Sequence, residues 1–143
     1  MAQIAAAPLV LKDARFIVAA DSYESSVSGV TFTPSSSTVS WKGLTPTALF
    51  TGITTATWTC EISYVQDWAT SNSLSQYLMN NEGKEIMVTF IPQTALTGTV
   101  PTFKARVLVS PGTVGGSVDS VAVASVTLGV LGRPTMTVAA VPA

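Results

Sequence analysis

The stretch "TWTCEISYV", residues 57–65, alternates apolar and polar side chains along its whole length. Successive side chains of a strand point to opposite faces, so the pattern predicts a half-buried strand. The side expected in the core holds Trp58, Cys60, Ile62 and Tyr64. The side expected at a polar surface holds Thr57, Thr59, Glu61 and Ser63. Cys60 is the only cysteine, so no disulfide can form within the chain. Its place in the alternating strand predicts that Cys60 is buried as a small hydrophobic side chain.

Further strands are predicted on both sides of this segment. The clearest lie at 86–91 and 103–109, and weaker signals occur at 9–20, 27–33, 38–42, 121–131 and 134–141. Short strands separated by Gly, Pro and Ser clusters are typical of an all-β sandwich or barrel. No internal repeat or charged linker divides the chain, so we expect one mainly β domain over residues 1–143. The apolar run at 121–131 is expected to be a strand buried on both faces.

One segment departs from the strand pattern and predicts a short flanking α-helix at about residues 73–81. Ser73 and Gln76 fit a capping box, with Ser73 as the N-cap and Gln76 reaching back to it. Gly83 follows where helices commonly stop in a left-handed conformation. A helix of about two turns is marginal on its own, so it should pack an apolar face on the sheet or over a barrel mouth. That face consists of Leu74, Tyr77 and Leu78.

A second irregular region, "TPSSSTVSWKGLTPTALFTGITT" at residues 33–55, mixes Ser and Pro with large apolar side chains. Long loops rich in apolar residues are usually functional or covered by a partner, because water does not favour that surface. We therefore expect a long loop or hairpin arm at about 33–55. Its apolar members lie outside clear core alternation and are the expected subunit-interface residues: Trp41, Leu44, Leu49 and Phe50.

The composition provides few charged residues to hydrate the surface of a monomer. Charged residues make up 10% of the chain, against about 25% in typical soluble domains, and the mean hydropathy is +0.44. The chain also holds 16 Ser and 20 Thr. Hydroxyl groups can cover the surface, and part of it can be buried against other subunits, and we expect both. A soluble monomer with a Ser/Thr coat is the alternative to an assembling subunit.

Several kinds of chemistry are excluded or unsupported. The chain has no His, which excludes Ser-His-Asp and Cys-His catalysis and any zinc site that uses His. The glycine-containing segment "SPGTVGG", residues 110–116, matches no phosphate-binding motif and is predicted to be a turn. Trp41, Trp58 and Trp68 offer a possible sugar-stacking platform, but packing is the favoured interpretation. We expect a protein that is not an enzyme, with no catalytic, cofactor-binding or metal-binding residues and no cofactor.

Binding to nucleic acid and insertion into a membrane are also unsupported. The net charge is −1 and the seven basic residues are scattered, whereas phosphate binding needs clustered Lys and Arg. The longest apolar stretch, 121–132, is shorter than the ~18–20 residues of a membrane span. The first fifteen residues have no basic region before their apolar residues, so we expect no secretory signal and synthesis in the cytoplasm.

The order of these features resembles a known family. Trp68 precedes a short helix with Ser73, Leu74 and Leu78, Gly83 leads into a strand that ends at Pro92, and a late strand closes with Gly132-x-Pro134. Over about residues 57–137 this order is similar to the C-terminal two-thirds of the major tail proteins that form the tail tube of long-tailed bacteriophages. The resemblance implies a β-sandwich or barrel with a flanking helix and extended termini, a fold shared with the tubes of contractile tails and type VI secretion systems.

The resemblance also implies a function. It suggests a structural virion protein of the tail, assembled in the host cytoplasm into hexameric rings that stack into a tube for DNA ejection. Its partners would be other copies of itself, other tail proteins at the tube ends, and genomic DNA that passes through without specific binding. The alternative is an immunoglobulin-like binding or decoration module on a virion or cell surface.

A tube that passes DNA should not hold it, which leads to an expectation about charge. Basic residues bind phosphate, so we expect a neutral or acidic lumen. The basic residues should then lie mostly in interfaces or on the outer wall. These residues are Lys12, Arg15, Lys42, Lys84, Lys104, Arg106 and Arg133. Lys104 and Arg106 share one face of a predicted strand, and the sequence leaves open whether that face, or Glu61, is turned to the lumen.

Overall fold

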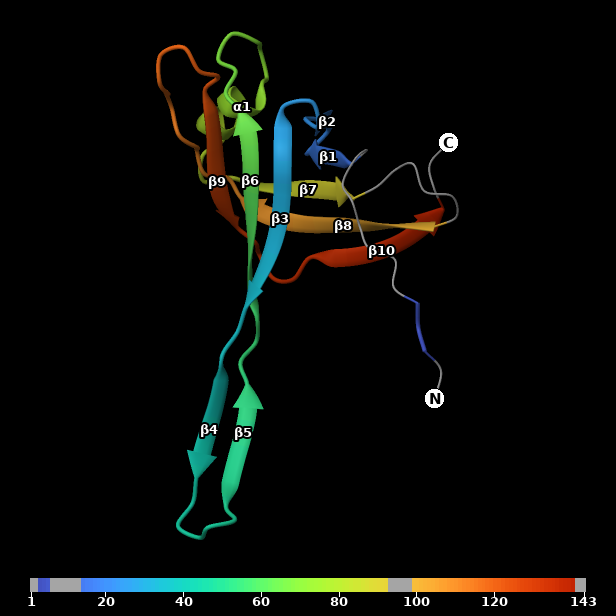
Figure 1. Cartoon of the computed structure of the whole chain (residues 1–143), viewed down its shortest axis with the longest axis vertical. Coiled ribbons are helices and arrows are strands. Elements are labelled where there is room, and N and C mark those ends of the chain that lie inside the picture. The colour runs from blue at the N-terminus through green and yellow to red at the C-terminus, as the bar shows by residue number, and fades with distance from the viewer. Residues whose placement is uncertain (1–2, 6–13, 93–98, 141–143) are drawn as a thin grey trace.

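Three antiparallel sheets and one short helix make up the chain in its computed structural model, which describes residues 3–5, 14–92 and 99–140. The predicted class, mainly β with one short helix, is confirmed. The sheets have the strand orders β10-β8-β7-β1-β2, β3-β6-β9 and β4-β5 (Figure 1). The elements are β1 (Arg15–Val18), β2 (Asp21–Ser22), β3 (Val27–Ser35), β4 (Thr38–Lys42), β5 (Leu49–Ile53), β6 (Thr57–Val65), α1 (Leu74–Asn80), β7 (Glu85–Ile91), β8 (Thr99–Leu108), β9 (Val123–Gly129) and β10 (Thr135–Ala140).

The strand β6 is the middle strand of the three-stranded sheet. Cys60 lies opposite Phe32 of β3 and Leu128 of β9, so both edges of β6 are paired. The alternation expected from the sequence is present, since Cys60 and Ile62 are buried while Glu61 is exposed. Trp58, expected in the core, is only half-buried. The physical reason is its place at the start of β6, where it lines an apolar groove instead of the closed core.

The hydrophobic core lies between the three-stranded and five-stranded sheets. In Figure 1 the strands of the two sheets run crosswise, with β3, β6 and β9 in front of β7 and β8. Such crossing packs the inner faces of two sheets into one core. The five-stranded sheet contributes the buried side chains Phe16, Val18, Val88, Ala105 and Val107. The three-stranded sheet contributes Val30, Cys60, Ile62, Tyr64, Ala124, Val126 and Leu128.

The chain passes from one sheet to the other at corners that partly close the sandwich. After β9, Val130 bridges to Val107 of β8, and the backbone N–H of Leu131 donates to the carbonyl of Arg106 at 2.7 Å. Gly132 follows with φ of 83°, a left-handed conformation that a residue with a side chain adopts only at a cost. The chain can therefore turn there and enter β10.

The strand β9 corrects one expectation from the sequence. The run at 121–131 was expected to be buried on both faces, but burial alternates strictly along β9. Ala124, Val126 and Leu128 are buried, whereas Val121 and Val123 are largely exposed. The reason is that no further layer of the described chain covers the outer face of the three-stranded sheet, to which β9 belongs.

The helix α1 begins as expected at Ser73, but only half of the predicted capping box forms. The backbone N–H of Gln76 donates to Ser73 Oγ at 3.4 Å. The Gln76 side chain does not reach back to Ser73, because the Ser73 N–H already donates to the carbonyl of Thr70 at 3.3 Å. Gln76 Nε2 donates instead to the carbonyl of Trp68. The capping side chains thus hold the preceding loop against the start of the helix.

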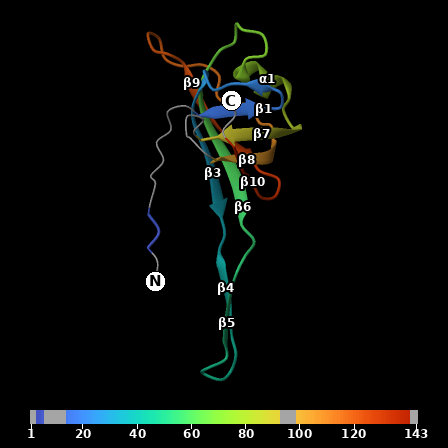
Figure 2. The ribbon, with the colours of Figure 1, turned by 90° about the vertical axis from the view of Figure 1, so that its right-hand side faces the viewer.

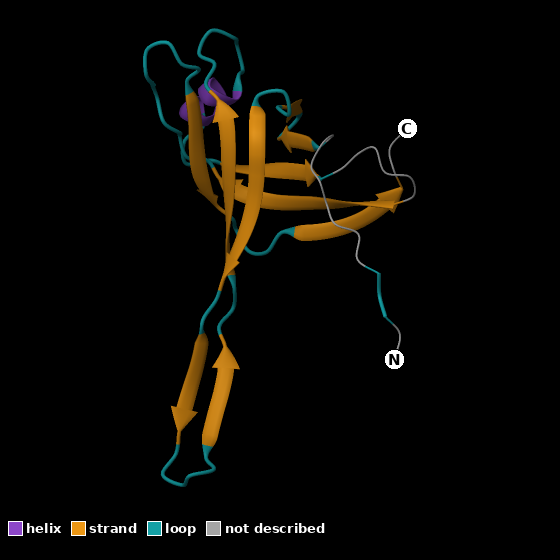
Figure 3. Ribbon diagram, in the orientation of Figure 1, coloured by secondary structure: helices purple, strands orange, loops and turns teal. Residues whose placement is uncertain are grey.

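The helix covers one end of the core (Figures 1 and 3). Leu74 and Leu78 are buried, and Tyr77 is half-buried with its ring centroid 6.3 Å from that of Tyr23. Gly83 ends this region with φ of 82°, and its N–H donates to the carbonyl of Val109 at 2.9 Å. A helix of seven residues gains its stability from this packing, because its own hydrogen bonds are too few.

Replacing Leu78 with Ala should lower the free energy of unfolding by about 2–5 kcal/mol, because the change leaves a cavity in the core. Met79 is the matched control, since it is the next residue on the same helix and is exposed. Met79→Ala should change stability by no more than about 0.5 kcal/mol. Urea denaturation followed by circular dichroism measures both. A Leu78→Ala cost no larger than that of the control would mean that the helix does not seal this core.

Gly112 allows a close approach by the buried Tyr64. A Cβ added at Gly112 would lie 2.0 Å from Tyr64 Oη and 3.1 Å from Tyr64 Cζ. Gly112→Ala should therefore destabilise the fold by about 1–3 kcal/mol, as overpacked substitutions do. Tyr64→Phe in the same chain should recover part of that loss, because the hydroxyl is the nearest clashing atom. Denaturation of the two single variants and the double variant tests this, and simple additivity of the two costs would contradict it.

Candidate functional site

The segment predicted as a loop or hairpin arm is a hairpin that continues the β3–β6 pair away from the sandwich (Figures 1, 2 and 3). Pairing of β3 with β6 ends at Ser35 and Thr57 and resumes between β4 and β5 at Thr38 and Ile53. The gap is bridged by the N–H of Thr54, which donates to the carbonyl of Ser37 at 2.8 Å. We call residues 36–56 the arm.

The arm exposes large apolar side chains to water. Every residue of β4 and β5 is exposed, and none of them belongs to the core of the sandwich. An isolated two-stranded hairpin is marginally stable in water, and a contiguous exposed apolar surface marks an interaction site. The four residues expected at a subunit interface all lie here and are more than half exposed: Trp41 (62%), Leu44 (107%), Leu49 (60%) and Phe50 (63%).

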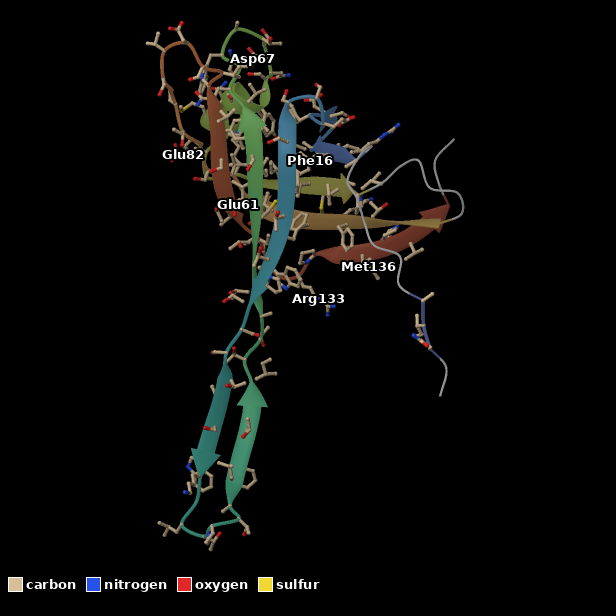
Figure 4. All side chains as sticks on the ribbon, in the orientation of Figure 1. Phe16, Glu61, Asp67, Glu82, Arg133 and Met136 are labelled. Atoms are coloured by element: carbon tan, nitrogen blue, oxygen red, sulfur yellow. The ribbon has the colours of Figure 1, made fainter. Side chains whose placement is uncertain are left out.

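The arm carries an aromatic pair on its strands and exposed side chains at its tip. Figure 4 shows that side chains project from the arm along its whole length. Trp41 lies opposite Phe50 across the two strands, with ring centroids 5.7 Å apart. At the tip, Gly43 donates its N–H to the carbonyl of Ala48 at 2.6 Å, and Leu44 projects fully into solvent. Next to Trp41 stands Lys42, the only charged residue between positions 25 and 60. The arm is thus apolar with one positive charge.

The end of the molecule opposite the arm carries two loops, residues 66–73 and 110–122 (Figure 1). We call them the far-end loops. Gln66 joins them, since its Nε2 donates to the carbonyl of Gly115 at 2.8 Å while its Oε1 accepts from the N–H of Gly115 at 2.9 Å. Three valines, Val114, Val118 and Val121, are exposed on the second loop, Val118 to 90%. These loops present a second apolar surface, held in place by hydrogen bonds.

The far-end loops carry negative charge. Asp67 accepts hydrogen bonds from the backbone N–H groups of Ala69 and Thr70, both at 3.1 Å. Hydrogen bonds from Thr70 lower the pKa of Asp67, so its carboxylate stays ionised at neutral pH. Asp119 lies in the second loop, and neither loop contains Lys or Arg. The arm and the far-end loops therefore carry opposite charges.

The outer face of the three-stranded sheet is covered by hydroxyl groups. Side chains on β3, β6 and β9 that point away from the core are mostly Ser and Thr, and Glu61 is the only charged one on these fully described strands (Figure 4). We call this surface the hydroxyl face. Its members are Gly29, Thr31, Thr33, Ser35, Thr57, Thr59, Glu61, Ser63, Val65, Val123, Ser125, Thr127 and Gly129.

The outer face of the five-stranded sheet is basic instead. Lys104 and Arg106, whose direction the sequence left open, point away from the core on this face. Arg106 Nη1 lies 3.8 Å from Glu85 Oε2, an exposed pair that contributes little to stability. Lys104 lies between Thr89 and Thr135 in the register. Arg15 adds a further positive charge to the same sheet, while Lys12 lies outside the described residues.

The three tryptophans do not form a common platform. Trp41 is on the arm and Trp68 is on a far-end loop, at opposite ends of the molecule. Trp58 lines an apolar groove of about 360 Å³ together with Phe32, Phe103 and Met136. This groove opens beside β10, and Arg133 also lines it. The sugar-stacking hypothesis, which needs neighbouring tryptophans, is therefore wrong for these three.

The titratable groups of the described residues are dispersed. Among residues 3–5, 14–92 and 99–140, no three His, Cys, Asp or Glu side chains gather as a metal site would require. Burial raises the pKa of the Cys60 thiol to about 12, so Cys60 stays protonated and unreactive at neutral pH. No helix in this part of the chain has both the length and the apolar character to cross a membrane.

Comparison with known proteins gives no family assignment. The sequence matches no protein-family model, and a search of curated proteins finds no match either. Any proposal about function therefore depends on the surfaces of the chain itself and on the order of features along its sequence.

Sequence reasoning located the arm but missed the far-end loops. The glycine-containing segment 110–116 was interpreted only as a turn, although the valines at 114, 118 and 121 were available as a signal. They are separated by Gly, Ser and Asp and follow neither a strand nor a helix period, so no pattern singled them out. Their exposure and their attachment to Gln66 appear only in three dimensions.

The sandwich should fold without the arm. A variant in which an Asn-Gly turn replaces residues 36–56 would join Ser35 directly to Thr57, which already face each other. Because the arm contributes nothing to the core, the free energy of unfolding should change by no more than about 1 kcal/mol. Circular dichroism and urea denaturation test this. Loss of a cooperative transition would show that the arm belongs to the folding unit.

Proposed function

We propose that this protein is a structural virion subunit that assembles into stacked hexameric rings, which form a bacteriophage tail tube for DNA ejection. The observation that carries the proposal is the arm, an apolar hairpin that projects from a sandwich whose core is complete without it. A side chain such as Trp41 or Phe50 is favourable there only when another molecule covers it. The order of features over residues 57–137, which resembles the major tail proteins, supports the same function.

The edges of the sheets supply surfaces for ring formation. The strands β3 and β9 are the edges of the three-stranded sheet, and β10 is an edge of the five-stranded sheet. Both β9 and β10 present backbone groups that a strand of another copy can pair with, whereas Pro34 interrupts the N–H groups of β3. A contact between two different edges of identical subunits is heterologous, and it produces a closed ring when the rotation closes. The number six comes from the resemblance alone.

The charge of the two outer sheet faces supports one orientation of the subunit in the wall. A polyanion slides past a surface that offers no cations, because each Lys or Arg that pairs with phosphate adds binding. The hydroxyl face has Glu61 as its only charge, whereas the opposite outer face carries Arg15, Lys104 and Arg106 together with Glu85 and is therefore net positive. We place the hydroxyl face toward the lumen and the basic face on the outer wall.

The remaining parts of the proposal follow from this role. The subunit would be assembled in the host cytoplasm and reside in the virion tail, with other tail proteins at the two ends of the tube. The low charged fraction of 10% suits a chain whose surface is repeatedly buried between copies. Genomic DNA would pass through the lumen without specific binding.

Negative-stain microscopy of the purified full-length chain tests the assembly. We expect hollow tubes built from six-membered rings, whereas the variant lacking residues 36–56 should remain a folded monomer. Met79→Ala, which alters an exposed side chain away from the arm, is the control and should still form tubes. A full-length chain that stays monomeric at high concentration would overturn the proposal and favour the immunoglobulin-like binding or decoration module.

Reversing the charge of Glu61 should make the lumen retain DNA. In tubes of Glu61→Lys, a short DNA duplex at ~50 mM salt should be bound and protected from nuclease, and the protection should fall steeply as salt is raised. Thr135→Lys places the same new cation on the opposite outer face, so DNA bound there should remain open to the nuclease. Tubes of the unaltered chain should protect none. Nuclease protection by Thr135→Lys instead of Glu61→Lys would reverse the assigned orientation.

A further inference from the structure

The arm and the far-end loops lie at opposite ends of the long axis of the molecule (Figures 1 and 2). Neither surface can cover the other within one subunit. A translation of a second copy along this axis brings the arm of one copy to the far-end loops of the next. Two different surfaces of the same chain that meet in this way form a heterologous contact, which repeats without limit along an axis.

Hydrogen bonds hold the far-end loops in a conformation that a partner can bind. Besides its bonds to Gly115, Gln66 Nε2 donates to the carbonyl of Val123 at 3.0 Å, and the Gln66 N–H donates to the carbonyl of Ala122 at 2.9 Å. Trp68 Nε1 donates to Gln66 Oε1 at 3.2 Å. The exposed valines therefore stand on a loop that is held at several points, and docking on it costs little ordering of the loop itself.

The charges of the two surfaces are complementary. Lys42 is the only charge on the arm, and it stands beside the aromatic pair of Trp41 and Phe50. The far-end loops hold Asp67 and Asp119 and no cation. Opposite charges at the rim of an apolar contact fix its register and favour the correct partner surface.

The apolar groove beside β10 is the competing acceptor for the arm. Arg133 lines this groove, so docking there would bring Lys42 toward a charge of the same sign. The groove also lies on the side of the sandwich from which the arm departs, as the labelled Arg133 and Met136 indicate (Figure 4). It is therefore placed for a lateral neighbour better than for the next copy along the axis.

We infer that the arm of one subunit docks on the far-end loops of the next subunit along the tube, with the arm tip against Val118 and with Lys42 facing Asp119. This inference rests on the proposed tube and names the contact between its rings. The occupant is a second copy of this chain, and the contact leaves a free arm at one end of every stack and free far-end loops at the other.

Disulfide trapping between substituted residues tests the contact. A chain carrying Leu44→Cys and Val118→Cys should, after mild oxidation of assembled tubes, give a ladder of linked subunits on a denaturing gel without reductant. Chains with either substitution alone should give dimers at most. The matched control is Leu44→Cys with Met136→Cys, which reports docking in the groove and should give no ladder. Cys60 need not be removed, because it is fully buried and unreactive.

A charge swap adds a second readout. Lys42→Glu should raise the protein concentration needed for tube formation about tenfold, since it sets like charges against each other at the contact. Adding Asp119→Lys should restore assembly. Adding Asp21→Lys, which alters an acidic residue of β2 that is not part of the far-end loops, should not.

The outcomes separate the two proposals. Tubes that form normally but give no ladder with Leu44→Cys and Val118→Cys, or a ladder with the groove pair instead, would overturn this contact and leave the tube function standing. Rescue of Lys42→Glu by Asp21→Lys as readily as by Asp119→Lys would also count against the contact. Failure of the unaltered chain to form any assembly would overturn both.

Discussion

The antiparallel pairing of β3 with β6 is the interaction on which the rest of the structure depends. It runs from Val27 opposite Tyr64 to Ser35 opposite Thr57, and its direction continues into the arm. One side of this ladder supplies core side chains such as Ile62, and the other side supplies the hydroxyl face. A slip of one residue would exchange the two sides, so the burial of Ile62 fixes the position of every hydroxyl group on the outer face.

The parts of the fold that local patterns specify were predictable from the sequence. The alternation around Cys60, the start of the helix at Ser73 and the left-handed turn at Gly83 each depend on a few neighbouring residues. The exposed outer face of β9 was not predictable, because apolar composition does not say which layers cover a strand. The partner of Gln76 was missed for a similar reason, since it depends on how residues 67–72 fold back over the helix.

The surfaces proposed for assembly were predictable only in part. Trp41 and Phe50 stood out because large apolar residues lay in a region rich in Ser and Pro, yet their pairing across a hairpin required the structure. An apolar residue signals an interface only once the core is known to be complete without it. Whether the core is complete depends on the tertiary structure. For this reason Val118, which is spaced among Gly, Ser and Asp, gave no signal in the sequence.

If the chain assembles as proposed, its exposed surfaces must not associate incorrectly beforehand. The exposed edge strand β3 carries Pro34 opposite Trp58, and proline has no N–H to offer to an added strand. The sheet faces nearby are covered with hydroxyls, which interact well with water. Exposed apolar side chains lie at the two ends of the long axis and also on β10, where Met136 and Val138 are exposed. At one end, the arm is a hairpin of marginal stability on its own. In the proposed assembly, contact with the correct acceptor would therefore be what stabilises the arm.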